Sequence, residues 1–277
     1  MNIHENKIEI NGSTVSYLEY KPVTYDHTLL CTHGNSSSAN AYEALFQLLN
    51  KNTRLISLSF NGHGESDVPE NNSCSIKEYI SSLVSFISIL GLEEYTIVGH
   101  SIGGHVAIES VPFLDENLEG LICICSPPFN QETISEAFTD PSDGNVFKGV
   151  LNETEVDLLT NCFIDPIHLS VVELDKLKHN IFNTNEIVRP GIGKSIISGD
   201  YYDEVSIINN ITVPVCFIQG EHDKFINEKY YYKYVNNKLC PIRIVTDSCH
   251  YPHIENPVAV ADIINNYLDV RLNVATI

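Results

Sequence analysis

The sequence of 277 residues has no tryptophan, one methionine and only 16 Lys and Arg residues against 36 Asp and Glu residues. Its formal net charge is −20, and it contains no run of basic residues. Nucleic acids and anionic membrane surfaces bind clustered cations, so we expect neither as a partner. We also expect no secretory signal and no membrane span. The first residues lack a basic segment followed by an apolar one, and no apolar run approaches the roughly 18 residues that a spanning helix needs.

The eight cysteines are scattered, without a Cys-x-x-Cys pair and without a Cys/His pattern at metal-ligand spacing. Several lie in apolar runs, where a thiol serves as a small hydrophobic group. This usage indicates a reduced, cytoplasmic protein. We therefore expect no metal and no cofactor.

The stretch from Tyr95 to Gly104 carries the clearest chemical signal. β-favouring residues run into Gly-x-Ser-x-Gly, and an apolar helical segment follows. A strand that turns abruptly into a helix holds its corner residue, here Ser101, in a strained conformation. The helix beginning at Ile102 directs free N–H groups and its positive dipole end at the same point. Ser101 is therefore a candidate nucleophile, although an ordinary serine in a glycine-rich turn would give the same pentapeptide.

Strand-like and helix-like segments alternate along most of the chain. Strands are expected at 7–10, 13–20, 28–32, 55–60, 95–98, 121–125, 215–218 and 242–245, and helices at 39–49, 75–90, 227–235 and 257–270. The first two strands are expected to form a hairpin across Asn11-Gly12. This order predicts an α/β protein with a mostly parallel sheet and helices on both of its faces.

The alternation stops after Pro127-Pro128, and no convincing strand follows until about Ile211. Helices are expected there at 153–162, 168–182 and around 193–197, broken at Asp165-Pro166 and Arg189-Pro190. The sequence thus predicts a core in two parts with an inserted helical cap, at residues 1–127, 128–210 and 211–277.

Two further loops with suitable chemistry follow parallel strands, where open α/β sheets build their sites. His250 can take the proton of Ser101 and return it to a leaving group, and Asp223 can fix the imidazole tautomer. His253 competes with His250 for the role of base, and Glu221 or Asp247 competes with Asp223. We prefer His250 and Asp223 because each comes directly after the exit of a buried strand.

A backbone N–H in the loop His33-Gly34-Asn35, at Asn35, is expected to join that of Ile102 in an oxyanion hole. Aromatic side chains of the cap are candidates for the wall of a substrate pocket, although cap aromatics also form small cores of their own. These candidates are Phe129, Phe138, Phe163, Tyr201 and Tyr202.

The sequence resembles the α/β-hydrolase superfamily in His33–Ser38, Gly62–Ser66, Gly99–Gly104, Gly220–Asp223 and His250–Pro257. A finer resemblance is to the α/β-hydrolase-type N-acyl-homoserine lactonases. It rests on the first of these stretches, on Gly103-Gly104-His105 and on Ser126-Pro127-Pro128. Related hydrolases usually have Asp at position 59 and Gly at 249, where this chain has Ser59 and Cys249. Neither position takes part in the chemistry, so these departures bear on subfamily placement alone.

The resemblance implies a cofactor-free serine hydrolase of the α/β-hydrolase fold that cleaves a small carboxylic ester or lactone, with quorum quenching as the role of a lactonase. A general carboxylesterase or thioesterase, or a C–C bond hydrolase, would use the same triad. A non-catalytic ligand receptor on this fold is the alternative from another class, and the intact Ser, Asp and His argue against it. The expected partner is a small neutral molecule, and the expected state is a monomer or homodimer.

Overall fold

The structure is a computed structural model that describes residues 2–237 and 240–274. Within them, eight strands form one sheet in the order β1-β2-β4-β3-β5-β6-β7-β8. The strands are β1 His4–Ile10, β2 Ser13–Tyr20, β3 His27–Thr32, β4 Thr53–Leu58, β5 Tyr95–His100, β6 Leu118–Ile124, β7 Val215–Gly220 and β8 Ile242–Val245. From β4 to β8 all neighbours pair in parallel. The predicted mostly parallel sheet is confirmed.

The amino-terminal hairpin also forms as predicted. β1 and β2 pair antiparallel with Ile10 opposite Ser13, and the two turn residues Asn11 and Gly12 have φ of 52° and 80°. Two consecutive positive φ values define the tight turn that Asn-Gly favours. β2 then pairs antiparallel with β4 and attaches the hairpin to the parallel part of the sheet.

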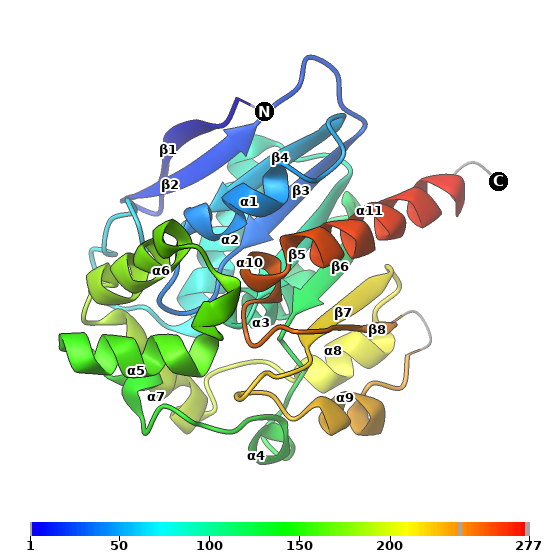
Figure 1. Ribbon diagram of the computed structural model, residues 1–277. Helices are drawn as coiled ribbons and strands as arrows, with labels where there is room; N and C mark the ends of the chain where they lie inside the picture. The colour runs from blue at the N-terminus through cyan, green and yellow to red at the C-terminus, as the bar shows by residue number, and fades with distance from the viewer. Residues whose placement is uncertain (1, 238–239, 275–277) are drawn as a thin grey trace.

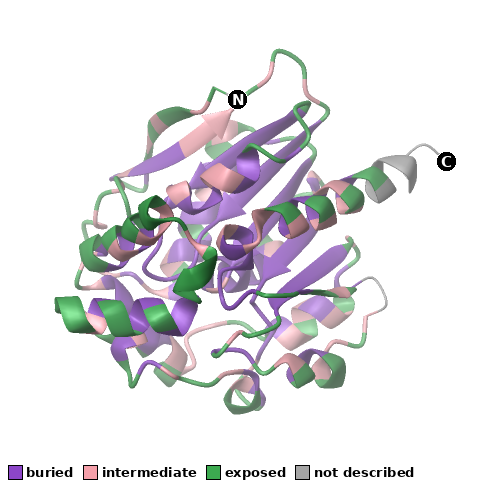
Figure 2. Cartoon of the chain, in the orientation of Figure 1, coloured by how far each residue is buried: buried purple, intermediate pink, exposed green. Residues whose placement is uncertain are grey.

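Helices cover both faces of the sheet (Figure 1). In that view α1 (Glu43–Phe46), α10 (Pro252–Glu255) and α11 (Pro257–Val274) lie in front, whereas α2 (Ile76–Leu90) and α3 (Ile102–Ser110) lie behind. β3, β4, β5 and β7 are buried along their whole length, as the purple sheet of Figure 2 shows. Strands that are covered on both faces have nearly continuous apolar sequences. These strands could therefore be predicted from the sequence.

Between β6 and β7 the described chain forms helices and turns. The helices are α4 Ile134–Ala137, α5 Glu153–Phe163, α6 Val171–Asn183, α7 Val188–Ser198 and α8 Glu204–Asn210, and α9 (Glu228–Tyr234) follows β7. The predicted break at Asp165-Pro166 is present, whereas the predicted break at Arg189-Pro190 is wrong. Pro190 lies in the first turn of α7, where a missing N–H costs nothing because first-turn amides have no partner within the helix.

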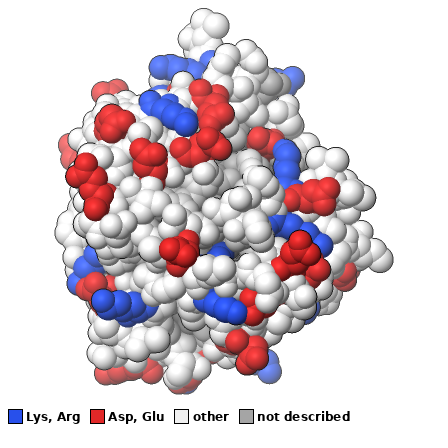
Figure 3. Space-filling model, turned by 90° about the vertical axis from the view of Figure 1, so that its left-hand side faces the viewer, with Lys and Arg blue, Asp and Glu red and all other residues white. Residues whose placement is uncertain are grey.

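The charged side chains of the cap face are intermixed. On the surface drawn in Figure 3, Asp and Glu are spread among Lys and Arg without a broad basic area. Across the described residues, no helix combines the length and apolarity that crossing a bilayer requires.

Candidate active site

Ser101 is the corner between β5 and α3. Its φ of 51° and ψ of −124° place it in a region that L-residues rarely adopt. A Cβ on Gly99 would lie 2.5 Å from the Cα of Gly104, and one on Gly103 would lie 2.4 Å from the Thr32 carbonyl oxygen. Only glycine permits this close approach of strand and helix, and the approach fixes the strained corner.

Ser101, His250 and Asp223 form one continuous chain of hydrogen bonds. Ser101 Oγ lies 3.0 Å from His250 Nε2, and His250 Nδ1 lies 2.8 Å from Asp223 Oδ2. Asp223 follows β7 and His250 follows β8, so three strand ends bring together residues up to 149 positions apart. This is the geometry in which a histidine can accept the serine proton.

The competing residues lie elsewhere. The ring of His253 stacks on that of Tyr42 at 4.9 Å, and among the described residues neither of its nitrogens has a hydrogen-bond partner. Glu221 and Asp247 are exposed and contact each other through the Asp247 N–H. Within the described residues none of the three hydrogen-bonds to Ser101, so the geometry selects His250 and Asp223.

The environment of Asp223 keeps its carboxylate ionised. Burial alone would raise the pKa of Asp223, but the His250 ring, the Phe225 N–H and the Cys125 thiol together hold that pKa below its usual value. The Phe225 N–H donates to Oδ1 at 2.8 Å and the Gln219 amide donates to Oδ2 at 3.1 Å. An ionised Asp223 accepts the His250 Nδ1–H and leaves Nε2 free to accept from Ser101. The candidates named from the sequence do not include Gln219 and Cys125. Their only sequence signal is that each lies at the end of a buried strand, Gln219 as a polar residue and Cys125 as a thiol.

The loop after β3 brings Asn35, one of the two residues expected to form the oxyanion hole, to the cavity beside Ser101. Phe60 N–H donates to His33 Nε2 at 2.9 Å, so the proton of the ring lies on Nδ1, which donates to the Gly34 carbonyl at 2.7 Å. In a trans peptide the N–H points opposite to the C=O, so the Asn35 N–H points away from His33. Asn35 and Ile102 both line the cavity beside Ser101. Ile102 opens α3, and its N–H has no partner within the helix.

A cavity of about 370 Å³ opens above Ser101 and His250. Most of its wall is apolar and comes from the cap, with Phe129, Ile134, Phe138, Val146, Phe147, Phe163, Ile192 and Ile196, together with Phe225 and Ile226 from the core. Such a volume and lining are typical of small-molecule sites. The structure thus places three of the five expected aromatics in the wall.

The other two expected wall residues lie outside the cavity. Tyr201 packs behind Phe129, with ring centroids 4.9 Å apart. Tyr202 faces outward, with its ring 5.5 Å from that of Phe113 and beneath the Lys77 ammonium. The prediction that these two residues line the cavity is wrong. Both precede α8, whose packing on α3 places Tyr201 behind the wall and Tyr202 on the outer surface.

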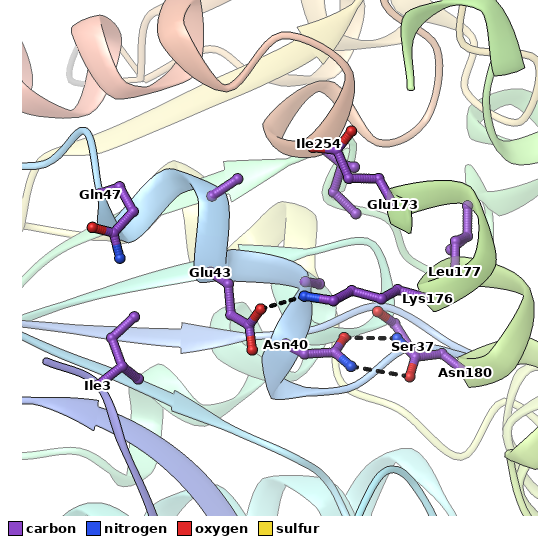
Figure 4. Close-up of a pocket in the computed structure, with 12 residues that line it drawn as sticks. Ile3, Ser37, Asn40, Glu43, Gln47, Glu173, Lys176, Leu177, Asn180 and Ile254 are labelled. Carbon is purple, nitrogen blue, oxygen red and sulfur yellow. Dashed lines mark hydrogen bonds and ion pairs between the residues drawn. The ribbon is translucent and has the colours of Figure 1, made fainter. Parts of the chain in front are cut away.

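A second hollow lies at the junction of α6 with the core (Figure 4), and Ser101, Asp223 and His250 are not among the residues that line it. In it Asn180 donates to Asn40 Oδ1 at 2.8 Å, and Lys176 pairs with Glu43 at 2.6 Å. None of its lining residues is a nucleophile or base held at reacting distance. We therefore interpret this hollow as part of the interface between the cap and the core.

The residues around Asp223 and His250 fit a metal ion poorly. In the described part of the chain, Cys125, Asp223 and His250 form the one group of three whose ligand atoms lie within 4.8 Å of one another. Burial raises the pKa of the Cys125 thiol far above its ordinary value, so it stays protonated, whereas a metal ligand must be a thiolate. The other two side chains are already engaged with each other and with Ser101.

The fold and the site define an α/β protein with a serine at a strained strand-to-helix corner and a histidine and carboxylate aligned behind it. Residues 27–257 match the model of the family described as alpha/beta hydrolase fold, so the chain belongs to that family. The matched region includes all three hydrogen-bonded residues of the site.

Solved structures and curated sequences give the same fold. The structure of the N-acyl homoserine lactonase AidH complexed with N-butanoyl homoserine superimposes with a TM-score of 0.87 at 19% identity over 97% of each chain. A thermophilic esterase from Thermogutta terrifontis gives 0.79 at 16% identity, over 97% of this chain and 99% of the other.

Among curated sequences, a Bacillus subtilis protein provisionally named 2-succinyl-6-hydroxy-2,4-cyclohexadiene-1-carboxylate synthase is 25% identical over 87% of this chain and 89% of its own length. The Serine hydrolase-like protein of Danio rerio is 24% identical over 50% of this chain, and the match spans only 41% of that protein. Similarity at these levels indicates the fold and leaves the reaction to the site residues.

Proposed function

We propose that this protein is a cofactor-free serine hydrolase that cleaves a small carboxylic ester or lactone. The observation that carries the proposal is the continuous hydrogen-bond chain from Ser101 through His250 to Asp223 at the floor of an apolar cavity. Membership of the alpha/beta hydrolase fold family supports hydrolase activity, and the chemistry of the donors supports attack on a carbonyl group.

The proposed reaction proceeds in two steps. Ser101 Oγ attacks the carbonyl carbon while His250 Nε2 takes the hydroxyl proton, and the N–H groups of Asn35 and Ile102 stabilise the oxyanion. The C–O bond then breaks, and the proton passes from His250 to the departing alkoxide. Water attacks the acyl-enzyme with His250 again as base and releases the carboxylate. From a lactone, alcohol and acid leave as one ring-opened molecule.

The cavity favours a neutral substrate with an acyl chain. Its volume and apolar walls suit an acyl group, and the ring or alcohol part would lie over Ser101. Among such substrates we propose N-acyl-homoserine lactones. The match to AidH over nearly the whole chain supports this choice, in addition to the short stretches quoted from the sequence.

Mass spectrometry of an N-acyl-homoserine lactone incubated with the protein tests the proposal. A gain of one water that requires Ser101 is the expected result, with Ser101→Ala as the control. p-Nitrophenyl esters of graded chain length are assayed in parallel. Unchanged lactone beside fast ester cleavage would identify a general carboxylesterase instead. Absence of hydrolysis together with absence of labelling by a fluorophosphonate would favour a ligand receptor.

A C–C bond hydrolase or thioesterase is the second candidate reaction. The Bacillus subtilis protein that is 25% identical over most of both chains is named as a synthase and not as an esterase, so substrates other than oxygen esters are worth assaying. The same triad would serve, so only substrate assays separate these reactions. Turnover of an acyl thioester or a vinylogous diketone at a rate above that of every oxygen ester would support this candidate.

A further inference from the structure

His105 brings a polar ring into the wall of the cavity. It lies on α3, four residues after the corner residue Ser101. The side chain lines the cavity although the residue is only 5% exposed. Its ring lies edge-on to Phe129 and Phe138, which line the same cavity, at 4.9 and 5.5 Å. The proposed hydrolysis gives this histidine no part.

The two nitrogens of His105 differ in their surroundings. Nδ1 lies 2.9 Å from Glu204 Oε2 and 3.1 Å from Glu204 Oε1. Across the described residues Nε2 has no hydrogen-bond partner. Glu204 is fully buried and also accepts the Phe129 N–H at 3.2 Å, so its carboxyl group is fixed from two sides. The ring is therefore held at Nδ1 and leaves Nε2 for a group in the cavity.

Glu109 determines which nitrogen of His105 carries the proton. This residue is fully buried on α3, and its Oε2 accepts the Tyr202 N–H at 2.8 Å. Its Oε1 is buried without a donor in the described chain, although the side chain is within hydrogen-bonding reach of Glu204. A proton on Glu109 Oε1, donated to Glu204, satisfies both groups. Glu204 then remains a carboxylate that accepts the Nδ1–H of His105.

Burial raises the pKa of Glu204 well above its usual value, but the hydrogen bond with Glu109 lowers that pKa again and raises the pKa of Glu109, so the shared proton is assigned to Glu109. Burial, followed by the neighbouring Glu204 charge, raises the pKa of Glu109 to about 9, so it keeps its proton at neutral pH. Burial lowers the pKa of His105 to about 3, so its ring is neutral. A neutral ring with its proton on Nδ1 presents a lone pair at Nε2.

We propose that Nε2 of His105 is a hydrogen-bond acceptor subsite that selects substrates with an N–H on the carbon next to the attacked carbonyl. The proposal rests on the proposed hydrolase function and specifies its substrate class. His105 lies in the first turn of α3 and lines the same cavity as Ser101, so a substrate whose carbonyl lies over Ser101 can present to His105 a donor two bonds from that carbonyl. Glu204 and Glu109 act through His105 as positioning residues.

A matched pair of esters isolates this hydrogen bond. Methyl N-hexanoylglycinate carries the N–H, and methyl 4-oxononanoate has a methylene in its place with the rest of the molecule retained. The intact chain should favour the amide ester in kcat/KM by about five- to tenfold, the usual effect of one neutral hydrogen bond. Equal kcat/KM values for the two esters would overturn the subsite.

Two substitutions distinguish the subsite from a structural role. His105→Leu should reduce the ratio of the two kcat/KM values to about one, and His105→Gln, which retains an acceptor, should keep part of the preference. In Glu204→Gln, the new amide oxygen can accept the Phe129 N–H while its NH₂ donates to Nδ1. The ring proton then moves to Nε2, and the preference should vanish or reverse although the cavity wall is unaltered.

An equal loss on both esters in every variant would show that the cluster only supports the wall and would contradict the subsite. If the protein hydrolyses other esters but shows no preference between the two matched esters, the subsite is wrong and the proposed hydrolase function stands. If no ester is hydrolysed and a fluorophosphonate does not label Ser101, the proposed function fails and the subsite fails with it.

Discussion

The core and the cap position their contributions to the site by different means. The core supplies Ser101, Asp223 and His250 from loops directly after β5, β7 and β8, whose relative positions are fixed by parallel hydrogen-bond ladders. The cap supplies most of the cavity wall from helices and loops outside the sheet, which an isolated bridge between Phe138 and Ile226 joins to the core. The sheet thus fixes the relative positions of the three hydrogen-bonded residues, whereas the shape of the pocket depends on side-chain packing between distant segments.

Arg189 shows how the cap is held together. It is 1% exposed, and the groups that accept its hydrogen bonds in the described chain are uncharged. Its guanidinium donates to the carbonyls of Lys148, Gly149 and Ile181 and to Ser36 Oγ in the loop before α1. Burial lowers the pKa of Arg189 to about 10, which still leaves it charged at neutral pH. One cation therefore joins two cap segments to the loop that carries Asn35.

Loss of the nucleophile should have the largest effect. It should reduce catalysis and leave the stability of the fold unchanged. Ser101→Ala is expected to lower kcat at least about a thousandfold, because the attacking oxygen is removed. Its unfolding free energy should stay within about 0.5 kcal/mol of the parent chain. Steady-state kinetics and urea denaturation check both expectations. Retention of more than about a hundredth of the activity would refute the assignment.

The base should match the nucleophile in severity. His250→Ala is expected to cost about as much as Ser101→Ala, and the double variant should be no worse, because the two side chains act as one unit. His253→Ala is the matched control, since this buried ring packs on Tyr42 without reaching the serine. A crippling effect of the control beside mild loss in His250→Ala would reverse the choice of histidine.

Removal of Arg189 should disturb the cap more than the core. Arg189→Met deprives three carbonyls of their donor, and unsatisfied buried groups cost about 1–3 kcal/mol each, so we expect a loss of about 3 kcal/mol or more. Hydrogen exchange should accelerate in α6 and α7 before it does in β5 or β7. Lys176→Ala removes the exposed pair with Glu43 and should cost under about 1 kcal/mol. Equal stability of the two variants would contradict this role of Arg189.

The buried acid Glu109 gives a smaller effect that depends on pH. Glu109 keeps its proton up to about pH 9 when folded, whereas in the unfolded chain it loses that proton near about pH 4.3. Between these values the folded state binds more protons, so the contribution of Glu109 to stability is complete at acid pH and is lost as pH rises.

Glu109→Gln imitates the protonated acid and should remove this dependence. The unfolding free energy of the variant should rise relative to the parent by up to about 1.4 kcal/mol per pH unit across this range. Exposed Glu153→Gln serves as the control. Denaturation curves at several pH values measure the difference, and parallel curves for parent and variant would contradict a protonated Glu109.

The sequence predicted the core well because its signals are local. Gly99, Ser101 and Gly103 encode the strained corner within five residues, and Asn11-Gly12 encodes the hairpin turn. The pocket wall was predicted only in part. Tyr201 lies behind the wall because of packing between α8 and α3, which no spacing along the chain records.

The His105 subsite illustrates the same limit. His105 and Glu204 are 99 positions apart, and their contact arises only when the end of the cap segment folds back on α3. Arg189 likewise lay at a predicted helix break, yet the structure buries it inside the first turn of α7. Burial and pairing of charged residues depend on tertiary contacts, which hydrophobic periodicity does not report.

Covalent trapping tests directly whether Ser101 is the nucleophile and whether His250 activates it. The intact chain is treated with a fluorophosphonate and digested, and the modified peptide is identified by tandem mass spectrometry, alongside His250→Ala and His253→Ala. We expect a single adduct on Ser101, formed rapidly in the parent and in His253→Ala and strongly slowed in His250→Ala. An adduct on another residue, or equal labelling rates in all three proteins, would contradict it.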